Sequence, residues 1–364
     1  MNSKKIMFYI SSLAKAGAQR VILNLTESLL SKGHQVTIVT TAVVENEYEL
    51  PKGANRIISD IQGEEITSNR IVNLKKRFCK LRNIWKEEHP DVIISFIGKN
   101  NFMAILTAWG LKIPVLVSVR GEPMEEYYNG LLRFLARYLF RKADGIILQT
   151  EDSKSFFPEN TTRKAIVLPN PLNPEFMKEL YEGEKEKKIV MVGRIDSNKN
   201  QKLVIDAFAY IASKYPEYKL EVWGDGEDYK SLKDYIASLH LEKQILMLGA
   251  TKEVRKKIEN ASLYILSSNT EGMPNSLMEA MALGLPCIST DCPCGGPKTL
   301  IQDGVNGLLI PVKDVSAMTK AMDRVLGNSE FAKELGKNAL KIRESLSPES
   351  VNNQWENYLV SKCR

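Results

Sequence analysis

The chain has 364 residues, of which 43% are hydrophobic and 26% are charged. This composition is typical of a folded globular protein and excludes collagen-like and intrinsically disordered classes. At roughly 150 residues per domain, the length predicts two domains, each large enough to bury its own core. Charge or glycine interrupts the most apolar stretches within about ten residues, so we expect no membrane-spanning helix.

The first half of the chain alternates short apolar runs with amphipathic segments of helical length, such as Ala18–Ser31. The apolar run at Ile6–Ile10 is too short for a signal peptide and has the length of a buried strand. Buried strands that alternate with helices are typical of a parallel sheet covered on both faces. Five strands are expected here: Ile6–Ile10, Gln35–Thr40, Asp91–Phe96, Pro114–Val119 and Gly145–Gln149.

A proline-rich stretch from Leu168 to Pro174, followed by the charged run Glu182–Lys187, interrupts this pattern and predicts a linker. A second series of strands follows at Lys188–Val192, Lys219–Trp223, Gln244–Leu248, Leu263–Leu266 and Pro286–Thr290, with helices at Gln201–Lys214 and Asp228–Leu239. The sequence therefore predicts an α/β protein of two Rossmann-like, doubly wound domains, residues 1–169 and 170–347. The segment 348–364 is expected to join the first domain as a helix. Ligands bind at the carboxyl ends of the strands in such sheets, so we expect the site in a cleft between the domains.

The first candidate for chemistry is the loop after the strand that ends near Gly193. This strand releases Arg194 and Lys199 into the loop. Arg offers a planar fork to phosphate oxygens and Lys a compact charge, so the pair suits a diphosphate. Two solvated surface cations are the plainer interpretation of the same residues.

A second glycine-containing turn, Gly224-Asp225-Gly226, follows the strand that ends at Trp223. Glycine lets a backbone approach a ligand closely, but two glycines without a third usually form only a tight turn. We expect this turn to line a site at most.

The strongest signal lies between Ser267 and Pro286. A helix is expected from Pro274 to Gly284, because proline suits a first helical turn and glycine a terminus. Its N-terminus would present the amides of Asn275, Ser276 and Leu277 to a phosphate. Glu271 precedes this helix and Glu279 lies within it, so the two carboxylates would reach different parts of one extended ligand.

This combination resembles the retaining glycosyltransferases of family 4, which have the GT-B fold. The resemblance rests on Gly193-Arg194, Lys199, Glu271 and Glu279 in this order, on the opening turn Ala14–Arg20, and on the late turn Asp303–Leu309. It implies that Arg194 and Lys199 hold the diphosphate of a nucleotide sugar, with amides of Ser276 and Leu277. It also implies that Glu279 binds the ribose, that Glu271 binds the donor sugar, and that Gly17 approaches the diphosphate or the acceptor.

The chain departs from the family pattern at two places. Ala16 fills a position where the first turn usually has a glycine, and Arg120 stands where many relatives have a histidine. Arg120 cannot move a proton at neutral pH, so we expect it, with Glu122, to act electrostatically or positionally on the acceptor side. His34, His89 and His240 are expected on the surface and do not replace the missing histidine.

The sequence contains no Asp-x-Asp motif, so we expect no metal and no cofactor besides the nucleotide sugar, which is a co-substrate. Nor does it offer a carboxylate pair for double displacement. Front-face retention, in which the leaving diphosphate accepts the proton of the acceptor, is the expected mechanism. A nucleotide-sugar epimerase, a non-catalytic nucleotide-sugar-binding subunit and, more remotely, a glycoside hydrolase remain alternatives.

The basic charge is concentrated in the first half, where residues 1–170 carry 24 lysines and arginines against 17 acidic residues. Cations alternate with apolar residues in Lys75–Arg82 and Arg133–Lys142. These segments are either solvated helix faces or contacts to an anionic membrane surface; no module for nucleic acid accompanies them. The resemblance implies a UDP-sugar donor. Together with these segments it predicts a polyprenyl-diphosphate-linked glycan acceptor and a cytoplasmic enzyme peripheral to the inner face of the membrane. The five cysteines fit reduced thiols.

Overall fold

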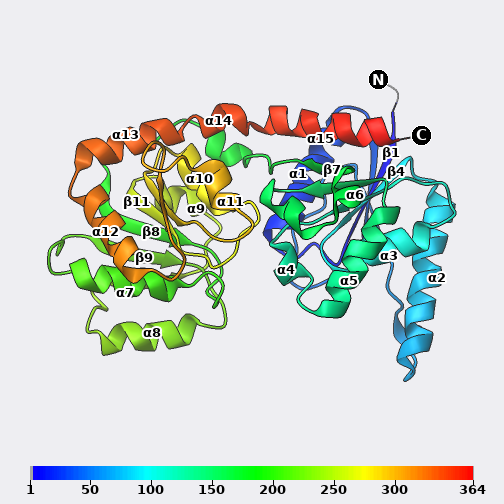
Figure 1. The fold of residues 1–364 in the computed structure, drawn as a ribbon, viewed down its shortest axis with the longest axis horizontal. Helices are drawn as coiled ribbons and strands as arrows, with labels where there is room; N and C mark the ends of the chain where they lie inside the picture. Colours follow the sequence, from blue (N-terminus) through cyan, green and yellow to red (C-terminus); the bar gives the residue numbers. More distant parts are fainter. Residues whose placement is uncertain (1–2, 364) are drawn as a thin grey trace. The chain divides into compact units, whose positions relative to one another are not determined.

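The computed structural model describes residues 3–363 of the chain, except for the side chain of residue 64. The chain divides into two compact units (Figure 1). Unit 1 comprises the residues up to Pro171 and those from Glu349 onward, and unit 2 comprises Leu172–Pro348. The chain passes from unit 1 to unit 2 after Pro171 and returns to unit 1 after Pro348. Both positions lie within two residues of the expected domain boundaries.

Unit 1 is built on a parallel sheet with the strand order β3-β2-β1-β4-β5-β6-β7. The strands are β1 (Lys5–Ile10), β2 (Gln35–Thr40), β3 (Asn55–Ile58), β4 (Val92–Phe96), β5 (Val115–Ser118), β6 (Gly145–Leu148) and β7 (Ala165–Val167). Strands β1, β4, β5 and β6 are buried along almost their whole length. This burial explains why they are continuously apolar.

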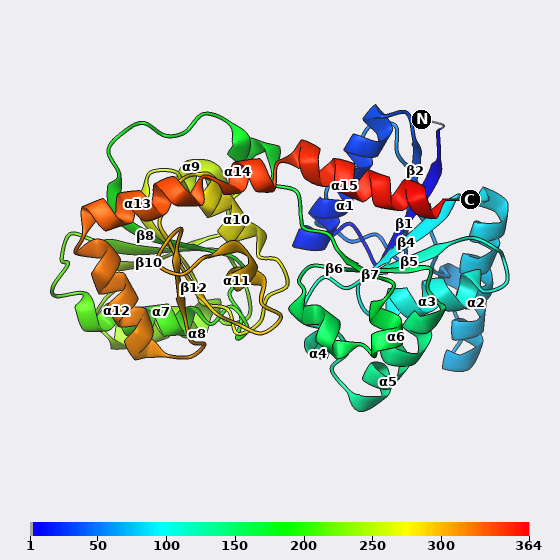
Figure 2. The same ribbon diagram turned by 45° about the horizontal axis from the view of Figure 1, so that its top comes forward.

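Helices connect the successive strands of unit 1, except between β2 and β3. They are α1 (Gly17–Ser31), α2 (Arg70–Glu88), α3 (Lys99–Ala108), α4 (Pro123–Glu126), α5 (Gly130–Leu139) and α6 (Glu159–Thr162). The long helix α15 (Pro348–Lys362) runs beside α1 in both views (Figures 1 and 2). Trp355 of α15 is fully buried and donates its indole N–H to the Pro169 carbonyl at 3.0 Å. The C-terminal helix therefore belongs to unit 1.

Unit 2 contains a second parallel sheet, ordered β10-β9-β8-β11-β12-β13. Its strands are β8 (Glu186–Val192), β9 (Lys219–Trp223), β10 (Ile245–Gly249), β11 (Ala261–Leu266), β12 (Cys287–Thr290) and β13 (Leu308–Ile310). Counted within the unit, this is the doubly wound order 3-2-1-4-5-6. The direction of winding reverses between β8 and β11, so the loops that follow these two strands lie at the switch point.

Eight helices surround this sheet among the described residues. They are α7 (Gln201–Ile211), α8 (Tyr229–Ser238), α9 (Val254–Ile258), α10 (Asn275–Ala282), α11 (Gly296–Leu300), α12 (Val315–Leu326), α13 (Ser329–Ala339) and α14 (Ile342–Ser345). The core joins α7 and α12 to the strands through residues such as Phe208 and Met322, both fully buried. None of the helices in residues 3–363 is long and apolar enough to cross a bilayer.

All ten expected strands are present, with ends that differ by at most two residues. Three further strands, β3, β7 and β13, were not predicted. Each has three or four residues and lies at the edge of its sheet. Short edge strands need no continuous apolar run, because they are paired along one side only. β3 begins with the polar residues Asn55 and Arg56, whereas β7 and β13 are apolar but have only three residues each.

The expectation that His34 lies on the surface was wrong. His34 is buried because α15 covers it, and its Nε2 lies 3.1 Å from Glu356 Oε1 on that helix. The backbone N–H of Lys4 donates to His34 Nδ1 at 3.1 Å. His89 and His240 are exposed, as expected. His34 therefore helps to attach α15 to unit 1.

Candidate active site

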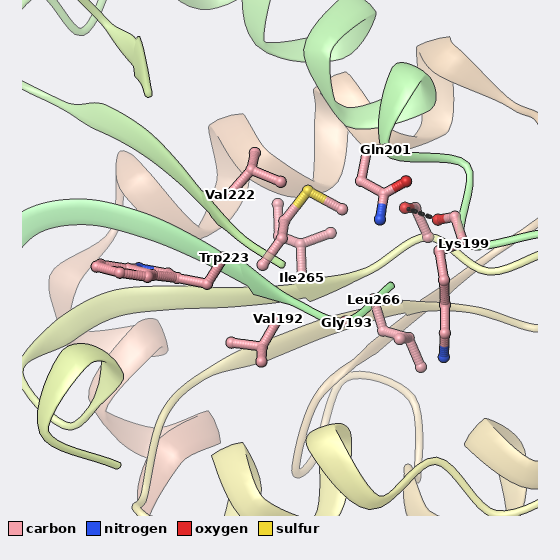
Figure 3. A pocket seen from close by; sticks show the side chains of 10 residues that line it. Val192, Gly193, Lys199, Gln201, Val222, Trp223, Ile265 and Leu266 are labelled. Carbon is pink, nitrogen blue, oxygen red and sulfur yellow. Dashed lines mark hydrogen bonds between the residues drawn. The ribbon is translucent and has the colours of Figure 1, made fainter. Parts of the chain in front are cut away.

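The loops after β8 and β11 meet at the switch point of unit 2, and they carry most of the predicted site residues. The first loop contains Gly193, Arg194 and Lys199, and the second contains Glu271. A small hollow of about 10 Å³ at the ends of β8, β9 and β11 is lined by Gly193, Lys199 and Gln201, among others. In Figure 3, Lys199 and Gln201 lie at one end of this hollow and Trp223 at the other.

Arg194 has an exposed side chain on a firmly held backbone. The side chain is 75% exposed, and its guanidinium lies 3.0 Å from Asp196 Oδ2. The Arg194 carbonyl accepts a hydrogen bond of 2.6 Å from the buried Gln201 side chain. An exposed guanidinium on a fixed backbone can reach an anion at the strand ends with little rearrangement of the fold.

Lys199 and Glu271 form an ion pair across the two loops. Lys199 Nζ lies 2.5 Å from Glu271 Oε1, and the two side chains are 18% and 13% exposed. Ser268 Oγ donates to the same carboxylate oxygen at 2.6 Å. Because each loop contributes one partner, the pair fixes a cation and an anion side by side at the strand ends.

Asn198 ties the same loops together, and the sequence analysis gave it no role. Its side-chain amide donates to the Thr270 carbonyl at 3.1 Å and accepts from the Thr270 N–H at 3.1 Å. Its backbone carbonyl accepts from the Asn269 N–H at 2.7 Å. The partners are more than 70 residues apart in sequence, so no local pattern could have identified this contact.

Helix α10 begins at Asn275, with Pro274 as its N-cap residue, and Gly284 follows its end in the left-handed region at φ 69°. Asn275 and Ser276 therefore form its N-terminus, as predicted. The Leu277 N–H, which we expected to bind phosphate, donates to the Pro274 carbonyl at 3.1 Å. The expected phosphate-binding role of this amide stays a prediction.

Glu279 lies one turn into α10 and is only 5% exposed. It shares its surroundings with Tyr264 of β11. Burial raises the pKa of the Tyr264 hydroxyl far above its usual range, and the charges of Glu279 and Glu271 contribute to this shift. Both predicted carboxylates are thus close enough to Tyr264 to affect the same phenol.

The remaining candidates, Gly17, Arg120 and Glu122, lie in unit 1. Gly17 is exposed at the first position of α1. Glu122 is the N-cap residue of α4, where its carboxylate accepts from the Glu125 N–H at 2.9 Å. Burial raises the pKa of Glu122 above its usual value. A capping carboxylate already has a structural role, so its geometry alone does not point to an acceptor.

Arg120 follows β5 and packs against two aromatic rings. Its guanidinium carbon lies 5.5 Å from the ring centres of both Phe96 and Trp355, and it donates to Asn170 Oδ1. Burial lowers the pKa of Arg120 to about 9, although the nearby Glu126 acts in the opposite direction. Arg120 therefore stays charged at neutral pH and is held against the C-terminal helix.

Comparison with known families connects this geometry with an activity. Residues 16–176 match the family model described as Glycosyltransferase Family 4, and residues 173–342 match the one described as Glycosyl transferases group 1. The chain is a family 4 glycosyltransferase. The boundary between the two matches falls at the linker that joins units 1 and 2.

Relatives of this glycosyltransferase extend over nearly its whole length. A Campylobacter jejuni alpha-1,4-N-acetyl-D-galactosaminyltransferase, named for a diNAcBac-PP-undecaprenol-linked substrate, is 29% identical over 96% of this chain and 97% of its own. A second C. jejuni enzyme, which adds N-acetylgalactosamine to a diphospho-undecaprenol-linked sugar, is 26% identical over 93% of this chain and 94% of its own.

The fold of the glycosyltransferase is also that of solved structures. The structure of Anabaena HepE in complex with UDP-glucose has a TM-score of 0.83 and 17% identity, and the match covers 98% of this chain and 100% of that one. The two parallel-sheet units are therefore those of the GT-B fold.

Proposed function

We propose that this glycosyltransferase transfers a hexose or N-acetylhexosamine, with retention, from a UDP-sugar to a polyprenyl-diphosphate-linked glycan. The observation that carries the donor half of the proposal is the ion pair of Lys199 with Glu271, 2.5 Å apart at the switch point. In this proposal, Lys199 binds the diphosphate and the neighbouring Glu271 carboxylate binds a hydroxyl of the donor sugar. Arg194 and the N-terminus of α10 add further positive charge at the same loops.

In the proposed mechanism, the acceptor oxygen forms a bond to the anomeric carbon on the face from which UDP leaves. The bond from this carbon to the β-phosphate oxygen breaks, and that phosphate oxygen takes the acceptor proton. Lys199 and Arg194 stabilise the charge that develops on the departing diphosphate. Glu271 orients the donor sugar and Glu279 the ribose, so no step needs a carboxylate nucleophile or a metal ion.

The choice of donor and acceptor rests on the relatives. The HepE structure contains UDP-glucose, and both C. jejuni enzymes are named for N-acetylgalactosamine transfer to undecaprenyl-diphosphate-linked sugars. UDP-N-acetylgalactosamine is accordingly the first donor to test. The acceptor of such a reaction is anchored in a membrane, so the enzyme must work at a membrane surface.

Unit 1 offers an apolar surface for this purpose, which we call the α5 face: Leu131, Phe134 and Tyr138. Their spacing of three and four residues places them on one side of α5, and they are 68%, 65% and 52% exposed. The Phe134 and Tyr138 rings stack at 6.2 Å. Exposed aromatic and aliphatic side chains on a short helix suit the headgroup region of a bilayer.

The cations of α5 are less available than the sequence suggested. Arg133 donates to the carbonyls of Tyr127, Met124 and Tyr128, and Arg137 donates to the Phe156 carbonyl at 2.9 Å. These contacts turn both side chains toward unit 1 itself. We therefore base the proposed membrane contact on the apolar α5 face rather than on Arg133 and Arg137.

The test is a transfer assay with UDP-N-acetylgalactosamine, UDP-N-acetylglucosamine, UDP-galactose and UDP-glucose, against short-chain polyprenyl-diphosphate glycans. We expect one donor to give an α-linked product by NMR, with activity largely intact in EDTA. A β-linked product would contradict retention, and strict dependence on a metal would contradict the role of Arg194 and Lys199. Conversion of the donor sugar without any acceptor would favour an epimerase, and binding without turnover a non-catalytic subunit.

A further inference from the structure

Two glycines outside the predicted site touch the backbone of the loops that carry it. Gly226 follows β9, and a Cβ atom at this position would lie 2.2 Å from the Ile195 carbonyl oxygen. Gly296 begins α11, and a Cβ atom there would lie 1.5 Å from the Gly272 carbonyl oxygen. Real Cβ atoms do not approach other atoms so closely, so any larger residue must displace the neighbouring backbone.

Gly226 supports the loop of Arg194 as part of a hydrogen-bonded pair of segments. The Ile195 N–H donates to the Asp225 carbonyl at 2.9 Å, and the Asp228 N–H donates to the Ile195 carbonyl at 3.1 Å. A methyl group on Gly226 would push the Ile195 carbonyl out of this arrangement. Because Arg194 is the preceding residue, its Cα position would change with that carbonyl.

Gly296 supports the loop of Glu271 in the same way. The Gly272 carbonyl that it contacts belongs to the residue after Glu271, and the Glu271 N–H points to the Pro293 carbonyl at 3.4 Å. The segment before α11 therefore packs directly on the Glu271 loop. A methyl group on Gly296 would move the Gly272 carbonyl and with it the carboxylate that pairs with Lys199.

We infer that Gly226 and Gly296 are positioning residues for the transferase, each holding one loop of the donor site at the distance that catalysis requires. This inference rests on the proposed function, because Arg194 and Glu271 are the groups being positioned. It assigns the turn Gly224-Asp225-Gly226 a role other than that of contacting the donor. Neither glycine has a positive φ that favours glycine. An alanine substitution therefore tests the steric contact of the added Cβ atom and not backbone strain.

The experiment is a set of double-mutant cycles on kcat/KM with the donor that the transfer assay identifies. Gly226→Ala should lower kcat/KM by about tenfold or more in the natural chain, and by less than about twofold in the Arg194→Ala background. Gly296→Ala should show the same coupling with Glu271→Gln. Gly226 should couple less to Glu271, and Gly296 less to Arg194. Gly130→Ala is the matched control, since its Cβ would meet nothing within 4 Å.

If Gly226→Ala lowers kcat/KM equally with and without Arg194, the inference is overturned. Loss of cooperative folding would also overturn it, because it would show a role in the fold as a whole.

Gln201→Met provides a gentler variant, because it removes the hydrogen bond to the Arg194 carbonyl without adding bulk. It too should lose its effect in the Arg194→Ala background. If the natural chain transfers no sugar, the proposed function fails separately. Faster hydrogen exchange at the Ile195 and Asp228 amides of Gly226→Ala would then support the loop geometry, and unchanged exchange would refute it.

Discussion

Lys199 and Glu271 are 72 residues apart in sequence, and their side chains meet at 2.5 Å where β8 and β11 end. Ser268 and Asn198 hold the two loops that carry them. A donor diphosphate that contacts Lys199 would therefore meet a cation that already has a carboxylate partner. In the proposed function, the pair would connect diphosphate binding with the orientation of the donor sugar.

Replacing either cation should impair turnover more than folding. We expect Arg194→Ala and Lys199→Ala each to cost about 2–4 kcal/mol of transition-state stabilisation, measured from kcat/KM. Arg194→Ala should leave the melting temperature unchanged because its side chain is 75% exposed, whereas Lys199→Ala should lower it by removing the partner of Glu271. Lys202→Ala, which breaks an exposed pair with Asp206 on α7, is the control. Unchanged kcat/KM in both site variants would refute the assignment.

The two carboxylates should differ in the ligand that they recognise. Glu279→Gln should weaken binding of UDP itself, because Glu279 is expected to bind the ribose. Glu271→Gln should weaken the UDP-sugar more than UDP, because its partner is the sugar. Isothermal titration calorimetry with both ligands measures the difference, and equal insensitivity of both ligands to both changes would reverse this interpretation.

Vesicle binding should depend on the α5 face. The double variant Leu131→Ser with Phe134→Ser should reduce sedimentation with anionic vesicles by about tenfold or more, because the apolar area available for insertion is lost. Tyr210→Ser is the matched control, since Tyr210 is 76% exposed on α7 of unit 2. If the double variant binds normally and salt alone releases the protein, electrostatic attraction would be the main cause of binding and the α5 face would not be the contact.

The attachment of α15 should depend on pH through Glu356. Burial acts to raise the pKa of Glu356, but hydrogen bonds from Lys32 and His34 outweigh it, so the pKa is below the ordinary value of 4.5. A lowered folded-state pKa gives stability that is complete above pH 4.5 and is lost as the pH falls through the folded value. Glu356→Gln should cost about 3 kcal/mol of unfolding free energy at neutral pH.

This difference from the natural chain should shrink at acid pH. Urea unfolding followed by tryptophan fluorescence reports it, because Trp355 is buried on the same helix. Glu349→Gln, an exposed change on α15, should show little difference at any pH. A Glu356→Gln penalty that stays constant down to about pH 3 would contradict the lowered pKa.

The amino-acid sequence determined the elements of this protein and the local features of its site. Buried strands are continuous apolar runs, so ten strands could be predicted from neighbouring residues. The start of α10 could be predicted from Pro274 in the same way. The position of Arg194, Lys199 and Glu271 in loops that follow β8 and β11 could be predicted in the same way, whereas their roles stay predictions. Of the edge strands that were not predicted, β3 contains the polar residues Asn55 and Arg56, and β7 and β13 have only three residues each.

Only the tertiary structure decided which loops meet and where long side chains turn. The order of the strands places β11 between β8 and β12. The first neighbour brings Asn198 to Thr270, and the second brings Gly296 to Gly272. Packing likewise turned Arg137 toward the Phe156 carbonyl and buried His34 under α15. Periodicity describes interactions within a few residues, whereas these contacts join residues that only the packing of whole elements brings together.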